Sequence, residues 1–233
     1  MFNPDHDAGK LNERYRVGDP FPHIVLDNFL DEWLVGQVAD ELEVVDSAKW
    51  FHDEHPDQVK KFAQSDLTRL PPATATVLRY FNSPRACTYF SELTGIPDLL
   101  PDPSYAGGGV HISLPGGHLG VHADFNLHPA TQLHRRVNAL LFLNRDWRSD
   151  WGGQFEIWPT DMSGPRKIVD PILNRLAAFS VNDTAFHGVP RKVACPPDRR
   201  RLSLALYYYT KERPDEEKAP FHWASWQHAR GSK

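Results

Sequence analysis

Two periods of apolar residues divide the chain. In residues 30–42 every fourth residue is apolar, and Asp, Glu and Gln lie among the residues between. The repeating positions are Leu30, Leu34, Val38 and Leu42. This spacing predicts an amphipathic helix, with Asp27 or Asn28 as its N-cap. Residues 72–80 and 84–93 each begin with proline and predict two further helices, the second ending near Gly95.

Residues 50–68 break this pattern, because they are polar and charged over almost their whole length. We expect them to form an exposed loop outside the core. With the helices on either side, residues 1–100 are expected to be a mostly helical support.

Beyond residue 101 the apolar period changes to two, which is typical of strands with one buried face. The runs are VHISL (110–114), HLGVHAD (118–124), VNALLFLN (137–144), GQFEIW (153–158), RLAAFSV (175–181) and RLSLALYYY (201–209), with short ones near Ile168 and His187. They predict a mainly β fold with flanking N-terminal helices, in which two antiparallel sheets close over a shared cavity as in a jelly roll or cupin. We expect one domain, 1–233, with its core at 105–210 and a polar surface arm at 211–233.

Composition narrows the functional classes. The chain has 233 residues, 26 Lys and Arg against 30 Asp and Glu, and a net charge of −4, which gives no reason to expect nucleic acid or an anionic membrane as partner. No stretch resembles a secretion signal or a membrane span, so we expect a soluble cytoplasmic protein. Two cysteines, Cys87 and Cys195, are too few for a thiolate metal cage. Oligomeric state is not predicted.

The strongest candidate for chemistry is the pair His122 and Asp124 in GVHADFNLH. Residues i and i+2 of a strand face the same side, so the imidazole and the carboxylate can reach one metal ion. A His-x-Asp spelling is expected about once by chance in a chain of this composition, and a second copy occurs at His55 and Asp57. We interpret that copy, and the near copy at residues 52–54, as solvated loop.

A third ligand must come from elsewhere, and His187 in NDTAFHGVP is the candidate, against the alternative of a structural histidine. Fourteen residues later Arg201 begins an apolar strand, where it shares a face with Ser203. A buried arginine is costly unless it meets an anion, and a ligand carboxylate would satisfy it.

Taken together, the runs HADFN, NALLFLNRDW, GGQFEIW, HGVPRKV and RRRLSLALYYYT resemble successive core strands of the Fe(II)/2-oxoglutarate-dependent oxygenases, in particular the prolyl-4-hydroxylase-like branch. The resemblance spans roughly residues 105–210. It implies a double-stranded β-helix in which His122, Asp124 and His187 hold Fe(II). It also implies that Arg201, assisted by Ser203, binds the far carboxylate of 2-oxoglutarate.

The chain departs from the branch where many relatives carry a cosubstrate-binding tyrosine on the third core strand. Here the strand has Leu140, Leu141 and Phe142, and Asn138 is the candidate substitute. Arg199 and Arg200 adjoin Arg201, so either neighbour remains an alternative for the anion site. The basic residues His128, His134, Arg135 and Arg136 are expected on the loop before this strand, either recognising an acidic substrate group or simply solvated.

The function implied is hydroxylation of an aliphatic C–H bond with O2, coupled to decarboxylation of 2-oxoglutarate to succinate and CO2. Three open positions on octahedral iron suit this chemistry, and an intact Asp124 favours it over halogenation. The compact size favours a small molecule such as an amino acid, a sugar or a secondary metabolite. The alternatives are a hydroxylase of peptide or protein side chains, a non-catalytic cupin-like binding protein, and a metal hydrolase or cosubstrate-independent dioxygenase.

Overall fold

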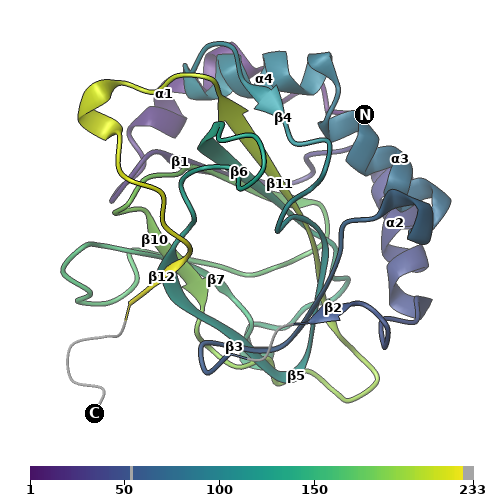
Figure 1. Cartoon of the computed structure of the whole chain (residues 1–233). Helices are drawn as coiled ribbons and strands as arrows, with labels where there is room; N and C mark the ends of the chain where they lie inside the picture. Colours follow the sequence, from purple (N-terminus) through teal and green to yellow (C-terminus); the bar gives the residue numbers. More distant parts are fainter. Residues whose placement is uncertain (53–54, 228–233) are drawn as a thin grey trace.

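The computed structural model describes residues 1–52 and 55–227, and within them antiparallel strands curl into a barrel (Figure 1). The main path of the sheet has the order β1-β9-β6-β11-β5-β10-β7-β8. Its strands are β1 (His23–Leu26), β5 (Gly109–Ala123), β6 (His134–Phe142), β7 (Phe155–Trp158), β8 (Lys167–Val169), β9 (Arg175–Ser180), β10 (Phe186–Val189) and β11 (Arg201–Thr210). Off this path lie β2 (Phe51–His52), β3 (Gln58–Gln64), β4 (Leu100–Pro101) and β12 (Ser225–Trp226). The predicted fold class, a mainly β double-stranded β-helix with flanking helices, is confirmed.

The long strand β5 connects the two sides of the barrel. Its first half pairs with β11, from Ser113↔Arg201 onward, and its second half pairs with β10, at His122↔His187. The two runs predicted at 110–114 and 118–124 are therefore one strand. Gly116, at a φ of 87° that favours glycine, lies between the two halves where the strand changes partner.

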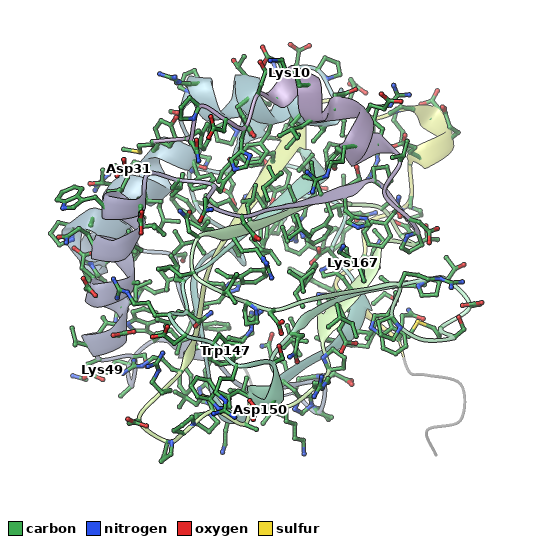
Figure 2. The ribbon with its side chains drawn as sticks, turned by 180° about the vertical axis from the view of Figure 1, so that it is seen from behind. Lys10, Asp31, Lys49, Trp147, Asp150 and Lys167 are labelled. Carbon is green, nitrogen blue, oxygen red and sulfur yellow. The ribbon has the colours of Figure 1, made fainter. Side chains whose placement is uncertain are left out.

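The helices cover one face of the sheet. They are α1 (Ala8–Arg16), α2 (Glu32–Val44), α3 (Pro72–Phe81) and α4 (Pro84–Thr94). Leu202, Leu204 and Leu206 of β11 pack with Leu42, Leu78 and Phe90 of these helices in one buried cluster. Seen from behind, Lys10 of α1 and Asp31 at the start of α2 lie at the margin of the molecule (Figure 2). The opposite face of β11 is thereby directed into the barrel.

Two helices match their predicted positions closely, since α3 and α4 begin at the predicted prolines. The capping prediction for α2 was wrong: the cap is Asp31, whose side chain accepts from the Leu34 backbone N–H, rather than Asp27 or Asn28. Asp27 instead pairs with Arg175, and Asn28 has a left-handed φ of 53° in the turn before the helix. No helix of the described residues is long and apolar enough to cross a membrane.

The described part of the N-terminal region, residues 1–52 and 55–101, contains four strands that sequence patterns did not indicate. The most consequential is β3, within the segment predicted to be an exposed loop, which pairs with β5 along most of its length. The second His-x-Asp copy, His55 and Asp57, was predicted to be loop and lies between β2 and β3. Of the near copy at residues 52–54, Asp53 and Glu54 lie outside the described residues. The predicted surface arm also contributes β12, which pairs with β5 at His122; its last six residues are not described.

Candidate metal centre

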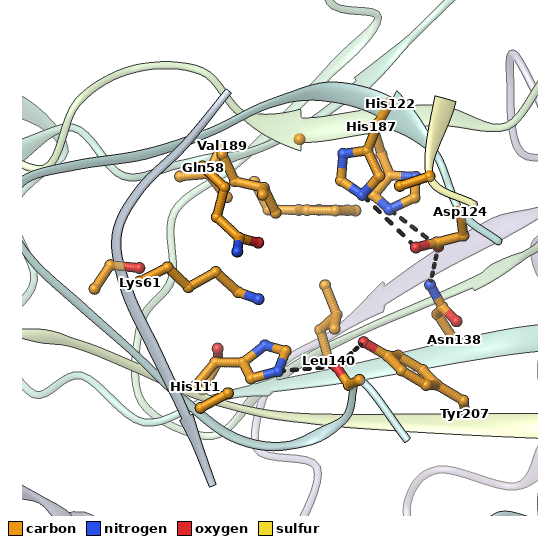
Figure 3. Close-up of a pocket in the computed structure, with 18 of the residues that line it drawn as sticks. Gln58, Lys61, His111, His122, Asp124, Asn138, Leu140, His187, Val189 and Tyr207 are labelled. Carbon is orange, nitrogen blue, oxygen red and sulfur yellow. Dashed lines mark hydrogen bonds and ion pairs between the residues drawn. The ribbon is translucent and has the colours of Figure 1, made fainter. Parts of the chain in front are cut away.

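The barrel formed by this sheet encloses a cavity of about 250 Å³. Inward-facing residues of β3, β5, β6, β10 and β11 line it, together with residues of the 224–226 segment (Figure 3). The polar lining residues are Gln58, Lys61, His111, Ser113, His122, Asp124, Arg135, Asn138, His187, Arg201, Ser203 and Tyr207. So many polar groups facing an internal space indicate a binding site rather than a packing defect.

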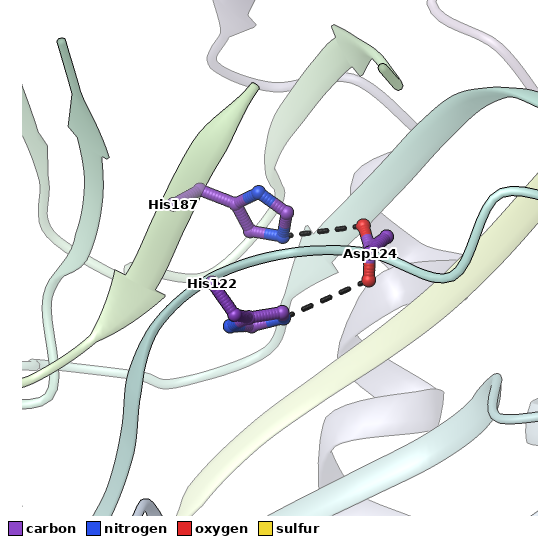
Figure 4. Close-up of side chains that lie close together, drawn as sticks. All are labelled: His122, Asp124 and His187. Carbon is purple, nitrogen blue, oxygen red and sulfur yellow. Dashed lines mark ion pairs between the residues drawn. The ribbon is translucent and has the colours of Figure 1, made fainter. Parts of the chain in front are cut away.

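Three of these residues converge on one point at the cavity wall (Figure 4). His122 lies on β5, Asp124 follows directly after the strand, and His187 lies on β10 opposite His122 in the antiparallel register. One potential ligand atom from each lies within 4.8 Å of the others. The Nε2 atoms of His122 and His187 are 3.6 and 3.3 Å from the two carboxylate oxygens of Asp124. A two-histidine, one-carboxylate set on one side of a cavity suits octahedral Fe(II) with open positions.

Contacts with backbone carbonyls fix the orientation of both imidazole rings. The Nδ1 of His122 lies 2.9 Å from the Gly120 carbonyl oxygen, and the Nδ1 of His187 lies 2.9 Å from that of Ala185. Because a carbonyl only accepts, each Nδ1 carries the proton and each Nε2 keeps a lone pair toward Asp124. Burial lowers the pKa of His122, with His187 adding to the effect, despite the opposing contribution of Asp124. His122 is therefore neutral near pH 7, as a metal ligand must be.

Asp124 is held as a carboxylate by a network from β6. The Nη2 of Arg135 lies 3.3 Å from one carboxylate oxygen, and Asn138 donates its amide to the other at 2.6 Å. Asn138 in turn accepts from Arg135 Nε at 2.9 Å. Burial acts to raise the pKa of Asp124, but Arg135, His187 and the contacts with both imidazoles outweigh it and hold the pKa well below its usual range.

Arg201 lies on the cavity-facing side of β11, as the strand period predicts, and is 5% exposed. Its Nε donates to the Gly153 carbonyl at 2.6 Å, and its guanidinium lies over the Phe142 ring at 5.2 Å. Within the described chain it forms no ion pair, and burial alone lowers its pKa to about 10. A buried guanidinium without an anion is the feature expected of a carboxylate-binding site.

The neighbouring arginines do not line the cavity. Arg199 donates to the Arg145 carbonyl at 2.6 Å, and Arg200 donates to the Val45 carbonyl at 2.9 Å. Ser203 does line it, next to Arg201 along the strand, and Asn138 faces it from β6. Of the residues predicted on a basic loop, His134, Arg135 and Arg136 are instead part of β6, and His128 is buried beside Asp102.

Sequence reasoning missed two residues of the cavity, Lys61 and Trp226, and placed a third, Arg135, on a loop instead of in the cavity wall. Arg135 is 1% exposed between the rings of Phe125 and Tyr207, with its guanidinium carbon 4.3 and 3.5 Å from their centroids. The ring of Trp226 in β12 packs against that of His122 at a tilt of 51°, with the ring centroids 5.0 Å apart. Lys61 enters from β3. The strand period could not have found Arg135, because strict alternation from Asn138 would direct it away from the cavity; the pairing of β6 with β11 shifts register between Tyr208 and Tyr209, opposite Val137 and Arg135.

Comparison with known proteins agrees with this geometry. Residues 108–209 match the family model of the 2OG-Fe(II) oxygenase superfamily. The triad and Arg201 all lie within that match. Among curated proteins none matches the chain in sequence.

Solved structures share the fold. A prolyl hydroxylase from Trichoplax adhaerens, in complex with a hypoxia inducible factor peptide fragment, is 19% identical with a TM-score of 0.62, over 87% of this chain and 89% of that one. A prolyl-4-hydroxylase from Pseudomonas putida is 17% identical, with a TM-score of 0.57 over 87% and 98%. HygX from Streptomyces hygroscopicus, with nickel, 2-oxoglutarate and hygromycin B bound, is 15% identical, with a TM-score of 0.52 over 87% and 92%.

The β core of this chain thus matches the 2OG-Fe(II) oxygenase superfamily, as the sequence resemblance predicted. The protein is accordingly an oxygenase that uses Fe(II), 2-oxoglutarate and O2. The cofactor prediction is confirmed, and the residues present suit both groups: neutral histidines and a carboxylate for the metal, and a buried arginine for the cosubstrate.

Proposed function

We propose that this protein hydroxylates an aliphatic C–H bond of a small molecule, with Fe(II) held by His122, Asp124 and His187. The observation that carries the proposal is the pairing of two features in one cavity. The ligand atoms of the triad converge within 4.8 Å, and the buried Arg201 lacks an anion among the described residues. A chelating cosubstrate with a second carboxylate would satisfy both.

Each side chain has a defined part in this proposal. The triad would hold Fe(II) at the cavity wall, and the metal would supply oxygen activation coupled to decarboxylation of the cosubstrate. Arg201 binds the far carboxylate of 2-oxoglutarate, and its contacts with Gly153 and Phe142 fix the guanidinium before the cosubstrate arrives. Ser203, next to it on the same face of β11, supports that carboxylate.

Asn138, predicted as a cosubstrate contact, is better suited to a positioning role. Both ends of its amide are already engaged, one with Asp124 and the other with Arg135. Such outer hydrogen bonds orient a ligating carboxylate and keep it ionised. We therefore assign Asn138 and Arg135 to holding Asp124 rather than to binding 2-oxoglutarate.

The cavity volume supports a small substrate. At about 250 Å³ it lies just below the usual range of ligand sites, roughly 300 to 1,000 Å³. Relatives of the same fold have been solved with a peptide fragment and with hygromycin B, so the fold itself allows both classes. A side chain of a protein is the alternative substrate. A cavity of this volume requires that this side chain alone enter it.

Two further proposals concern the setting of this chemistry. One buried cluster joins helices α2, α3 and α4 to the sheet, which supports a single functional domain. Cys87 and Cys195 are both free thiols, which suits a reducing compartment such as the cytoplasm.

The first test is anaerobic absorption spectroscopy of the purified protein with Fe(II), with and without 2-oxoglutarate. We expect a broad visible charge-transfer band that requires both components and is lost in His187→Ala. His134→Ala, in a histidine outside the cavity lining, is the matched control and should keep the band. Stoichiometric iron binding without the band would favour the cosubstrate-independent or non-catalytic alternatives.

A further inference from the structure

The hairpin formed by β2 and β3 brings a lysine into the cavity by a backbone irregularity. Strict alternation from Gln58, which lines the cavity, would direct Lys60 inward and Lys61 outward. The pairing of β3 with β5 shifts register between Val59 and Lys61, and Lys60 has a left-handed φ of 49°. This bulge reverses the alternation, so Lys61 lines the cavity while Lys60 is exposed and donates to the Pro115 carbonyl.

Lys61 has no anion of its own. Among the described residues no hydrogen bond or ion pair reaches its ammonium group, which points into the space between Gln58, His111 and Leu140 (Figure 3). Burial lowers its pKa to about 8, with Asp124 opposing the shift and Arg201 and Arg135 adding to it. Holding a lysine here costs folding free energy, so its presence needs a compensating ligand.

The charged side chains that line the cavity are not balanced, because cations outnumber carboxylates. The described lining residues include three cations, Lys61, Arg135 and Arg201, and one carboxylate, Asp124. Arg135 is paired with Asp124. If 2-oxoglutarate occupies the metal and Arg201, Lys61 remains as the cation without a partner.

Lys61 and Arg201 approach the cavity from opposite sides of one strand. Both pair with Ser113 of β5, Lys61 from β3 and Arg201 from β11. Across two strand spacings their Cα atoms are about 10 Å apart. The contacts of Arg201 with Gly153 and Phe142 draw its guanidinium toward β6 and β7, away from β3. One carboxylate bound by Arg201 is therefore poorly placed for Lys61 as well.

We propose that Lys61 binds a carboxylate of the primary substrate, so that the substrate class is small aliphatic carboxylic acids, including amino acids. This inference rests on the proposed function, since it assumes that Arg201 is occupied by the cosubstrate. A single ammonium group balances one negative charge, which is what a carboxylate carries near neutral pH. The side chain of Gln58, on the same strand, lines the same cavity.

The test uses the anaerobic complex with Fe(II) and 2-oxoglutarate. Its visible band is titrated with free amino acids and short aliphatic carboxylic acids, each paired with its primary amide, and succinate release in air is measured for the same panel. At least one acid should perturb the band and stimulate turnover, with the matching amide at least about tenfold weaker.

Variants then assign the effect to this lysine. Lys61→Met should raise the half-saturating concentration of the acid about 10- to 100-fold while the 2-oxoglutarate requirement stays within about twofold. Lys60→Met, next along the chain but exposed, should match the wild type.

Three results would overturn the inference: no acid that perturbs the band, equal responses to acid and amide, or a Lys61→Met variant that binds the acid normally. A raised 2-oxoglutarate requirement in Lys61→Met would assign the lysine to the cosubstrate and also overturn it. Loss of the band in the wild type itself would instead refute the proposed function.

Discussion

The metal side and the cationic side of the cavity differ in how their polar groups are satisfied. On the metal side, the histidine Nδ1 atoms bind backbone carbonyls, and Asp124 accepts from Asn138 and pairs with Arg135. On the cationic side, Lys61 and Arg201 meet no anion of the described chain. The first set is organised by the protein alone, whereas the second is complete only when ligands bind. The variants below test this difference.

The largest effect is expected for Asp124→Ala, which removes a ligand and the anion that Arg135 requires. Iron binding and the 2-oxoglutarate band should fall to background. The unpaired Arg135 should also destabilise the ligand-free fold by about 3 kcal/mol. Iron titration and urea unfolding measure the two effects. Asp150→Ala, at an exposed pair with Arg148, should change neither, and iron binding retained by Asp124→Ala would contradict the assignment.

Arg201→Met should raise the half-saturating 2-oxoglutarate concentration about 100-fold, because a charge-assisted carboxylate contact contributes about 1.5 to 3 kcal/mol. The visible band should return at high 2-oxoglutarate, since the metal ligands are untouched. Arg199→Met, whose arginine binds a backbone carbonyl outside the cavity, is the control. A variant with the normal 2-oxoglutarate requirement would place the anion site elsewhere.

Lys61→Met should stabilise the ligand-free protein. Because burial lowers the pKa of Lys61 to about 8, the protonated lysine is less favourable in the folded state than in the unfolded chain. This penalty is fully present below pH 8 and disappears as the pH approaches the ordinary lysine pKa of 10.5.

Because Lys61 is partly exposed, we expect Lys61→Met to raise the free energy of unfolding by about 2 kcal/mol at pH 7 and by less at pH 9. Urea unfolding with a chelator present at both pH values measures this gain. Lys60→Met should show no such pH-dependent change. A destabilised Lys61→Met at pH 7 would mean that the lysine already has an intramolecular partner.

Asn138→Ala should give the smallest effect, an iron affinity about tenfold weaker, as expected when a residue that orients a metal ligand is lost. The variant removes the 2.6 Å hydrogen bond to Asp124 but no ligand. Its 2-oxoglutarate requirement at saturating iron should stay normal, which separates a positioning role from direct cosubstrate binding. A raised requirement would restore the cosubstrate role predicted for Asn138 from sequence.

The β half of the fold could be predicted because its strands bury one face. In β11, Leu202, Leu204 and Leu206 pack on the helices while Arg201 faces the cavity, so the period of two carries the information. The register His187↔His122 then brings together ligands that are 65 residues apart. The strand period alone could not predict that the strands of His122 and His187 pair; the resemblance to the oxygenases indicated it.

The strand β3 could not be predicted for a physical reason. Its inward side chains face a polar cavity instead of an apolar core, so Gln58 and Lys61 read as solvated residues. The bulge at Lys60 also breaks the alternation that would identify a strand. The roles of Arg135 and Asn138 could not be predicted for another reason. Both side chains contact Asp124, which lies outside β6, and no local sequence pattern encodes such a contact.

The pairing of β12 with β5 bears on how the protein is made. Trp226 covers His122 and stacks on His55 at 5.1 Å, so residues from three distant parts of the sequence meet at one metal ligand. During synthesis from the N-terminus, His122 is complete more than a hundred residues before its cover emerges. A nascent chain can therefore form the iron-binding face of the barrel while that face is still open. The cover over His122 is added only when β12, which follows the other strands of the barrel in the chain, has been translated.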